Sequence, residues 1–346
     1  MGGPSPAVAG VRLAVRQALA GLATGVPPVP LVLAACSGGA DSLALASAVA
    51  FEAPRLGLRA GAITVDHGLQ AGSAERAERV AALLAAMDLD PVLVVRAEIT
   101  TRRVPAAIAP APGGRRTAYQ GPEAAARAGR YAAFESALER TGAAAILLGH
   151  TLDDQAETVL LGLARGSGAR SLAGMAPRSG PYLRPLLGLR RADTRAACAS
   201  LGQRPWDDPH NDDPAYARVR VRKAIMPQLE EQLGPGVAQA LARTAAQLRA
   251  DAEVLDGIAA AELNFLENEL LGLEVAALAR LPAAIRTRVL RAAAVAAGVP
   301  AGALTAGHVA ALDALITDWH GQRWVDLPGS VRGTRRYGRL RFATRD

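Results

Sequence analysis

The fold of this 346-residue chain is decided by the stretch LVLAACSGGADS, residues 31–42. Its first five residues form an apolar run, which stops just before a serine and a glycine pair, and an apolar helical pattern begins at Leu43. A short apolar run bounded by glycine is typical of a buried strand, and the pattern after it predicts a helix. Glycines let the backbone between them turn tightly, because they lack a Cβ. The stretch therefore predicts a strand, a tight turn and a helix.

The same alternation repeats along the first two thirds of the chain. Short apolar runs recur at 60–65, 91–95 and 143–148, and helical patterns cover 7–24, 75–87, 123–140 and 151–163. Strands that alternate with helices indicate a doubly wound, mostly parallel sheet, an α/β fold with helices on both faces. In such sheets ligands bind beyond the carboxyl ends of the strands.

The last third of the chain has a different pattern. Helical patterns cover 216–233 and 237–270, and two more precede a hairpin-like end at 323–342. We therefore predict three parts, which are an α/β catalytic domain at 1–235, a linker helix at 236–270 and a small α+β domain at 271–346. Residues 100–122 are rich in proline, glycine and arginine, which is typical of an insertion.

Composition limits the function classes. The formal charge of +7 favours a polyanionic partner, although a basic enzyme of any kind could carry it. Two cysteines, Cys36 and Cys198, are too few for a disulfide framework or a cysteine-rich zinc site. No window approaches the roughly 20 apolar residues that a bilayer requires, so we expect a cytoplasmic protein with no membrane span.

The turn at 37–42 has the properties of a phosphate site. The free N–H groups and the positive dipole end of the following helix suit phosphate oxygens, and Ser37 and Ser42 add hydroxyl donors. Asp41 is unusual, because its carboxylate repels phosphate unless a cation lies between them. This predicts Mg²⁺ or a cationic substrate nearby. The bland alternative is an ordinary strand-to-helix turn.

Acidic and histidine side chains follow two other predicted strands. Asp66 and His67 end the run at 60–65, and His150 precedes a helix that carries Asp153, Asp154 and Glu157. Asp154 and Glu157 are three positions apart and share one helix face. These acids either complement the helix dipole or bind a cation.

Arginines form two further candidate sites. Arg218 and Arg222 lie on one face of the predicted helix at 216–233, where they suit a phosphate or a solvated surface equally. Near the end of the chain, arginines surround Tyr337, a composition that fits contact with RNA backbone and stacking on a ring, or simply an exposed basic tail. These are Arg332, Arg335, Arg336, Arg339 and Arg341.

The motif Ser-Gly-Gly-x-Asp-Ser after the first strand resembles that of the PP-loop family of ATP pyrophosphatases. Further motifs follow in order and are similar to those of the tRNA(Ile)-lysidine synthetases. They are VDHGLQ (65–70), GHTLDDQAET (149–158), RGSG (165–168), RPL (184–186), Ala126-Arg127 with Arg130-Tyr131, and Asn211 with Arg218, Arg220 and Arg222. The resemblance covers roughly residues 29–230, whereas the last third matches only in size and position.

The resemblance implies an ATP-dependent ligase. Such enzymes join lysine to C2 of the wobble cytidine of the isoleucine tRNA with a CAU anticodon, through an adenylated cytidine, and release AMP and pyrophosphate. The partners would be this tRNA, free lysine and ATP with Mg²⁺, and the oligomeric state stays open, a homodimer included.

The site residues follow from the matched motifs. We expect catalysis by Asp41, Asp154, Arg218 and Arg222. We expect ATP binding by Ser37, Gly38, Gly39, Ala40, Asp41, Ser42, Asp66, His67 and His150. Lysine would contact Asp154, Glu157 and Arg127, and a Mg²⁺ site would use Asp41 and Asp154. Outside the matched motifs, the composition near the end of the chain predicts tRNA contact by Arg332, Arg335, Arg336 and Arg339.

Three rival functions use the same fold. A PP-loop tRNA thiolase needs cysteine pairs or a catalytic cysteine, which Cys36 and Cys198 do not resemble. If the protein were a small-molecule amidating ligase, the C-terminal arginines would have no clear function. A non-catalytic nucleotide sensor would bind ATP without turnover.

Overall fold

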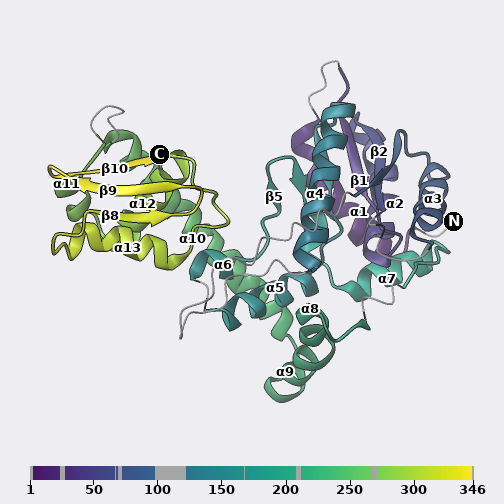
Figure 1. Cartoon of the computed structure of the whole chain (residues 1–346). Coiled ribbons are helices and arrows are strands. Elements are labelled where there is room, and N and C mark those ends of the chain that lie inside the picture. Colours follow the sequence, from purple (N-terminus) through teal and green to yellow (C-terminus); the bar gives the residue numbers. More distant parts are fainter. Residues whose placement is uncertain are drawn as a thin grey trace. The chain divides into compact units, whose positions relative to one another are not determined.

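The computed structural model describes residues 3–23, 28–66, 68, 72–97, 122–166, 168–207, 212–266 and 272–344. His67, Asn211 and residues 100–121 of the predicted insertion lie outside the described residues. The chain forms two compact units (Figure 1). The first consists of Met1–Glu157 and Met175–Gln239, and the second of Thr158–Gly174 and Ala240–Asp346.

The described part of the first unit contains a six-stranded sheet in the order β3-β2-β1-β4-β6-β5. Its strands are β1 (Leu31–Ala35), β2 (Arg59–Asp66), β3 (Val92–Arg96), β4 (Ala145–Leu147), β5 (Arg178–Ser179) and β6 (Tyr182–Leu183). All neighbours are parallel except β5, which runs antiparallel to β6. The strand order reverses between β1 and β4, so a ligand crevice is expected at their carboxyl ends.

Alternation along β1 explains why both faces of the sheet are covered. Val32 and Ala34 belong to a core with helices on one face, and Leu33 packs with Phe134 of α4 on the other. Figure 1 shows α4 crossing one face, with α1 and α2 behind the sheet. The helices of this unit are α1 (Pro6–Leu19), α2 (Ala40–Glu52), α3 (Ser73–Ala85), α4 (Pro122–Thr141), α5 (Leu152–Ala164), which extends into the second unit, α7 (Arg191–Ser200), α8 (Ala217–Arg220) and α9 (Met226–Leu233).

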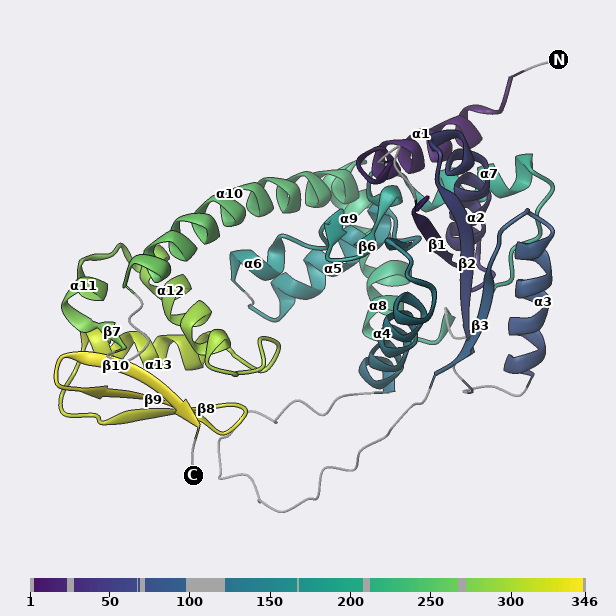
Figure 2. The same cartoon turned by 90° about the horizontal axis from the view of Figure 1, so that it is seen from above.

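The second unit has its own antiparallel sheet and core. The sheet order is β7-β10-β9-β8, and Figure 2 shows β8, β9 and β10 side by side. Its core includes Leu278, Leu290, Leu312 and Leu340, all fully buried. The elements are α6 (Ala169–Leu172), α10 (Val237–Leu266), β7 (Leu273–Glu274), α11 (Val275–Arg280), α12 (Ala283–Ala296), α13 (Ala306–Thr317), β8 (Trp324–Leu327), β9 (Val331–Arg336) and β10 (Arg339–Thr344).

The predicted fold class is confirmed, with local differences. The hairpin predicted at 323–342 is a three-stranded meander that β7 extends. The predicted linker helix corresponds to α10, Val237–Leu266. The second unit begins within this helix, at Ala240, and also takes 158–174, so the boundary at 235 stays a prediction. No helix in the described ranges is long and apolar enough to cross a membrane.

Candidate active site

The turn between β1 and α2 has the geometry of a closed loop. Gly38 adopts φ +86°, and a Cβ there would lie 2.9 Å from Val80 Cγ2, so only glycine fits. The Ser42 hydroxyl donates to the Gly39 carbonyl at 2.9 Å and accepts the Ser37 N–H at 3.2 Å. The first N–H groups of α2 have no partner within the helix, and the residues that carry them, Ala40, Asp41 and Ser42, line a cavity. The loop can therefore receive phosphate oxygens.

A cavity of about 830 Å³ lies at the carboxyl ends of β1 and β4. Its walls include the loop residues Ser37, Gly39, Ala40, Asp41 and Ser42, and also His150, Asp154, Arg127, Arg218 and Arg222. The chain after β4 reaches the start of α2 closely, since a Cβ on Gly149 would lie 3.1 Å from the Asp41 carbonyl carbon. The cavity thus occupies the expected crevice of the sheet.

Two predicted nucleotide residues are not among the residues that line this cavity. Gly38 shapes the loop from behind, against Val80 of α3. Asp66 is buried at the end of β2, and its carboxylate accepts the Gly68 N–H at 2.9 Å. Asp66 therefore holds the turn after β2.

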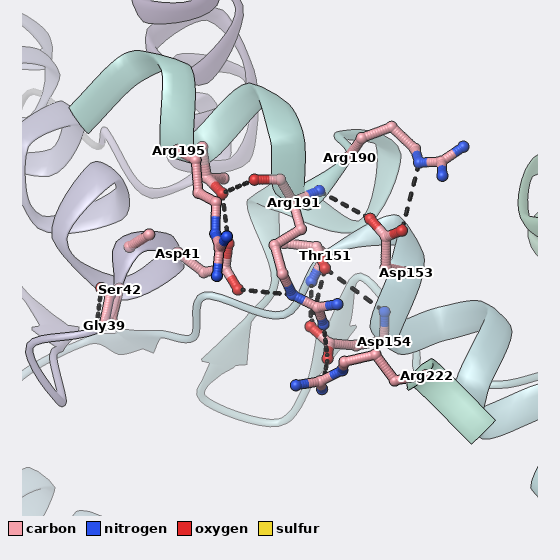
Figure 3. A network of polar contacts seen from close by, with 12 residues as sticks. Gly39, Asp41, Ser42, Thr151, Asp153, Asp154, Arg190, Arg191, Arg195 and Arg222 are labelled. Atoms are coloured by element: carbon pink, nitrogen blue, oxygen red, sulfur yellow. Dashed lines mark hydrogen bonds and ion pairs between the residues drawn. The ribbon is translucent and has the colours of Figure 1, made fainter. Parts of the chain in front are cut away.

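Arg191, the first residue of α7, connects three carboxylates (Figure 3). Its Nε lies 3.5 Å from Asp41 Oδ2, and its Nη2 lies 2.8 Å from Asp154 Oδ1 and 3.5 Å from Glu157 Oε1. Asp41 also accepts a hydrogen bond from the Thr194 hydroxyl, one turn further along α7. Asp41 therefore has a cation and a hydroxyl donor beside it within the protein, and a guest cation at this position stays a prediction.

Glu157 is almost fully buried and holds Arg222. Arg222 donates from Nε to Glu157 Oε1 at 2.7 Å and from Nη2 to Oε2 at 3.2 Å, a bidentate pair. Arg222 lies in a π-helical turn, Val221–Ile225, that joins α8 to α9. Arg218 and Arg222 both line the cavity, as one helix face predicts, but Glu157 is not among its lining residues. Direct contact between Glu157 and lysine therefore finds no support in this geometry.

Asp153 contacts the start of α7, the helix that carries Arg191. Its carboxylate accepts the backbone N–H of Arg191 at 2.7 Å and lies 3.3 Å from the Arg190 guanidinium. A carboxylate at a helix N-terminus is favourable, because it meets free N–H groups and the positive dipole end. Asp153 therefore positions α7 against α5.

Burial and neighbouring charges move three pKa values. Burial raises the pKa of Asp41, against the opposing effects of Thr194 and Arg191. Burial also favours a raised pKa at Asp154, but Arg191, hydrogen bonds from Thr151 and the charge of His150 together lower it. Burial lowers the pKa of His150 to about 4, and Arg184, Arg127 and Arg218 add to this effect. His150 is therefore neutral near pH 7.

Both oxygens of Asp41 and of Asp154 already have partners within the protein, so a Mg²⁺ site at these carboxylates stays a prediction. Asp41 offers one oxygen to Thr194 and the other to Arg191, and Asp154 offers one to Arg191 and the other to Thr151. Mg²⁺ needs oxygen ligands in a near-octahedral set. Nowhere in the described ranges do three or more His, Cys, Asp or Glu residues gather to hold a metal. We derive no catalytic step through this ion.

Comparison with known proteins identifies the family. A model described as a PP-loop domain matches residues 16–229, and one described as the TilS substrate binding domain matches residues 273–341. The tRNA(Ile)-lysidine synthase of Thermobifida fusca is 57% identical over 340 residues, 98% of this chain and 98% of its own. That of Streptomyces coelicolor is 52% identical over 363 residues, with the same coverage of both chains. The chain belongs to the tRNA(Ile)-lysidine synthase family.

A solved structure supports the same fold. The U34-tRNA thiolase NcsA from Methanococcus maripaludis has a TM-score of 0.53 and covers 70% of this chain and 79% of its own. Its sequence identity is 17%, so the likeness shows the fold alone.

The C-terminal arginines of this tRNA(Ile)-lysidine synthase family member differ in the groups that they contact. Arg332 pairs with Asp326 at 2.8 Å, whereas Arg335 and Arg339 donate to the carbonyl oxygens of Leu315 and Gly272. Arg336 is exposed and lies over the ring of Tyr337, which is 87% exposed. Arg335 also lies over the ring of Trp319, and Arg336 is the exposed one of these four described arginines.

Sequence reasoning missed Arg191, Thr194 and Gly149. Arg191 begins a helix where a basic residue opposes the dipole, so no local pattern marks it. Gly149 sits in a quoted motif, but its role depends on the distance between β4 and α2. From the sequence, a cation was expected in this place only because the Asp41 carboxylate would repel a phosphate in the loop.

Proposed function

We propose that this protein ligates lysine to C2 of the wobble cytidine of the isoleucine tRNA with a CAU anticodon. Cytidine O2 attacks the α-phosphate of ATP and pyrophosphate leaves, and the ε-amine of lysine then displaces AMP. The main observation behind this proposal is one cavity, at the point where the strand order reverses. It combines a phosphate-type loop, a basic wall and an ionised carboxylate. Membership of the tRNA(Ile)-lysidine synthase family supports the substrate assignment.

The ATP half of the site uses the loop and the basic wall. Ser37, Gly39, Ala40 and Ser42 surround the start of α2, where helix N–H groups favour phosphate oxygens. The wall adds cations that would stabilise charge developing on the α-phosphate, which are Arg127, Arg130, Arg195, Arg218, Arg222 and Lys223. Neutral His150 offers a ring N–H or a lone pair to the nucleotide instead of a charge.

The lysine half uses Asp154. Its lowered pKa keeps it ionised, which suits an ammonium group, and it lines the cavity. The same lowered pKa makes it a weak base, so we assign it binding of the ammonium. Glu157 acts on the site through Arg222, whose guanidinium it holds in place.

The second unit offers candidate tRNA contacts of its own. Arg336 and Tyr337 provide an exposed cation and an exposed ring, the two features that suit an RNA backbone and an unstacked base. Arg332, Arg335 and Arg339 lie on the same two strands, β9 and β10. A tRNA substrate also favours a cytoplasmic location, and a homodimer and Mg²⁺ with the ATP stay predictions.

Thiolase chemistry finds no comparable support. Both cysteines of the chain are buried, and burial raises the pKa of Cys36 and raises that of Cys198 to about 11. Both therefore remain thiols near pH 7, and thiols are poor nucleophiles.

The test is incubation with ATP, radiolabelled lysine and a transcript of the isoleucine tRNA with a CAU anticodon. We expect lysine in the tRNA in a one-to-one ratio with AMP. A transcript with uridine at the wobble position is the matched control and should stay unlabelled. Nucleotide binding without turnover would support a sensor instead, and labelling of the control transcript would remove the cytidine assignment.

A further inference from the structure

The first turn of α7 joins the two halves of the site. Arg191 and Thr194 are three positions apart on one helix face, and both reach Asp41 at the start of α2. The Arg191 guanidinium continues to Asp154 at the start of α5. One short segment therefore contacts a residue of the phosphate loop and the residue assigned to the lysine ammonium.

The position of Arg191 is unfavourable for α7 taken alone. A basic residue in the first turn opposes the helix dipole. The Arg191 side chain is also only 19% exposed, so its guanidinium loses most of its hydration. The two carboxylates it faces are 24% and 12% exposed. Its contacts compensate for these costs, because each of the three buried charges has an opposite charge beside it.

The guanidinium geometry sets the spacing of the two carboxylates. Nε faces Asp41 and Nη2 faces Asp154, so a planar, rigid fork lies between them. Glu157 and Asp154 also pair with Arg222, at 2.7 Å and 3.6 Å. Loss of Arg191 therefore removes the cation that Asp41 and Asp154 share, and the repulsion between these two carboxylates increases.

We propose that Arg191 is a positioning residue that fixes the ATP-side carboxylate Asp41 relative to the lysine-side carboxylate Asp154. This inference rests on the proposed function. Addition of the lysine amine to C2 of an adenylated cytidine, followed by loss of AMP, depends on the relative placement of the two bound groups, and a misplacement of about 1 Å costs roughly 100-fold in rate. Arg191 acts through the carboxylates and is not assigned a contact with the reacting atoms.

The experiment compares Arg191→Ala, Arg191→Lys and the adjacent control Arg190→Ala in the full chain. Arg190 is 38% exposed and pairs only with Asp153 among the contacts drawn in Figure 3, so its variant should keep kcat within about threefold of wild type. We expect Arg191→Ala to lower kcat for lysine ligation about 100-fold. The KM for lysine should stay equal or fall, since Asp154 loses a competing cation.

The conservative variant separates positioning from simple folding. Arg191→Lys restores a positive charge but cannot present two N–H groups in a fixed fork, so kcat should recover only in part. A role in folding alone would instead lower the concentration of active enzyme in proportion to the apparent kcat, and a role in binding lysine would raise the KM for lysine. Either result, or a kcat for Arg191→Ala within threefold of wild type, overturns the inference. Failure of wild type to ligate lysine would count against the proposed function and not against Arg191.

Discussion

Substitution of one loop glycine should destabilise the protein, while substitution of its neighbour should not. Gly38→Ala forces an alanine into φ +86°, which costs about 1–2 kcal/mol. The new Cβ would also lie 2.9 Å from Val80 Cγ2, and Val80 is buried and stiff, which adds about 1–3 kcal/mol of overpacking. The expected loss is therefore about 2–5 kcal/mol in the free energy of unfolding.

Gly39→Ala is the matched control. Gly39 has φ −75° and ψ 162°, which alanine adopts freely, and the nearest atoms would lie 3.8 Å and 3.9 Å from its Cβ. Alanine at a compatible position stabilises a protein by about 0.4–1 kcal/mol, by restricting the unfolded chain.

Thermal unfolding of the two purified variants checks this difference. One kcal/mol shifts the Tm by roughly 2–4 °C in a domain of 150–250 residues, so Gly38→Ala should lower the Tm by at least about 4 °C. Gly39→Ala should match or exceed wild type. Equal losses in both variants, or no loss in Gly38→Ala, would refute the assignment of the strain to Gly38.

Three further outcomes are expected. Asp41→Asn should reduce AMP formation at least ~100-fold with little change in Tm, because Thr194 can still donate to its amide oxygen; undiminished turnover would remove Asp41 from catalysis. Replacing both Arg336 and Tyr337 with alanine should weaken tRNA binding, measured by filter binding, and leave ATP binding unchanged, and equal tRNA affinity would contradict the RNA assignment. The pKa of His150 lies at about 4 in the folded state and near 6.5 in the unfolded state, so between these values the unfolded state binds more protons. The free energy of unfolding should therefore rise with pH across that window, by at most roughly 3 kcal/mol, and His150→Gln should flatten this rise in urea unfolding; an unchanged slope would contradict it.

Patterns within short segments were enough to predict the fold. The apolar run at 31–35 and the helix pattern after it depend on periodicity and on glycine, which act within a few residues. The same local chemistry predicted a phosphate site at 37–42, since a helix start carries free N–H groups in any context. The order of these units along the chain then indicated a doubly wound sheet, and the structure confirms it.

Burial changed the interpretation of the acidic residues. The sequence places Asp154 and Glu157 on one helix face, and both were predicted to contact lysine. The structure separates them, because Asp154 lines the cavity whereas Glu157 is enclosed and bound to Arg222. Exposure depends on which segments pack against a helix, and no pattern within the helix records that.

What the sequence alone determined is the strand, the turn and the helix, and the phosphate ligand of the turn stays its prediction. Only the tertiary structure decided which side chains lie beside Asp41 and Asp154. Thr194 is 153 positions from Asp41, and Arg191 is 37 positions from Asp154. The tertiary structure also distinguished Gly38 from Gly39, through the approach of Val80 from another helix. Contacts of this kind arise from packing between distant segments, whereas the local signals arise from bonds and turns that each segment carries with it.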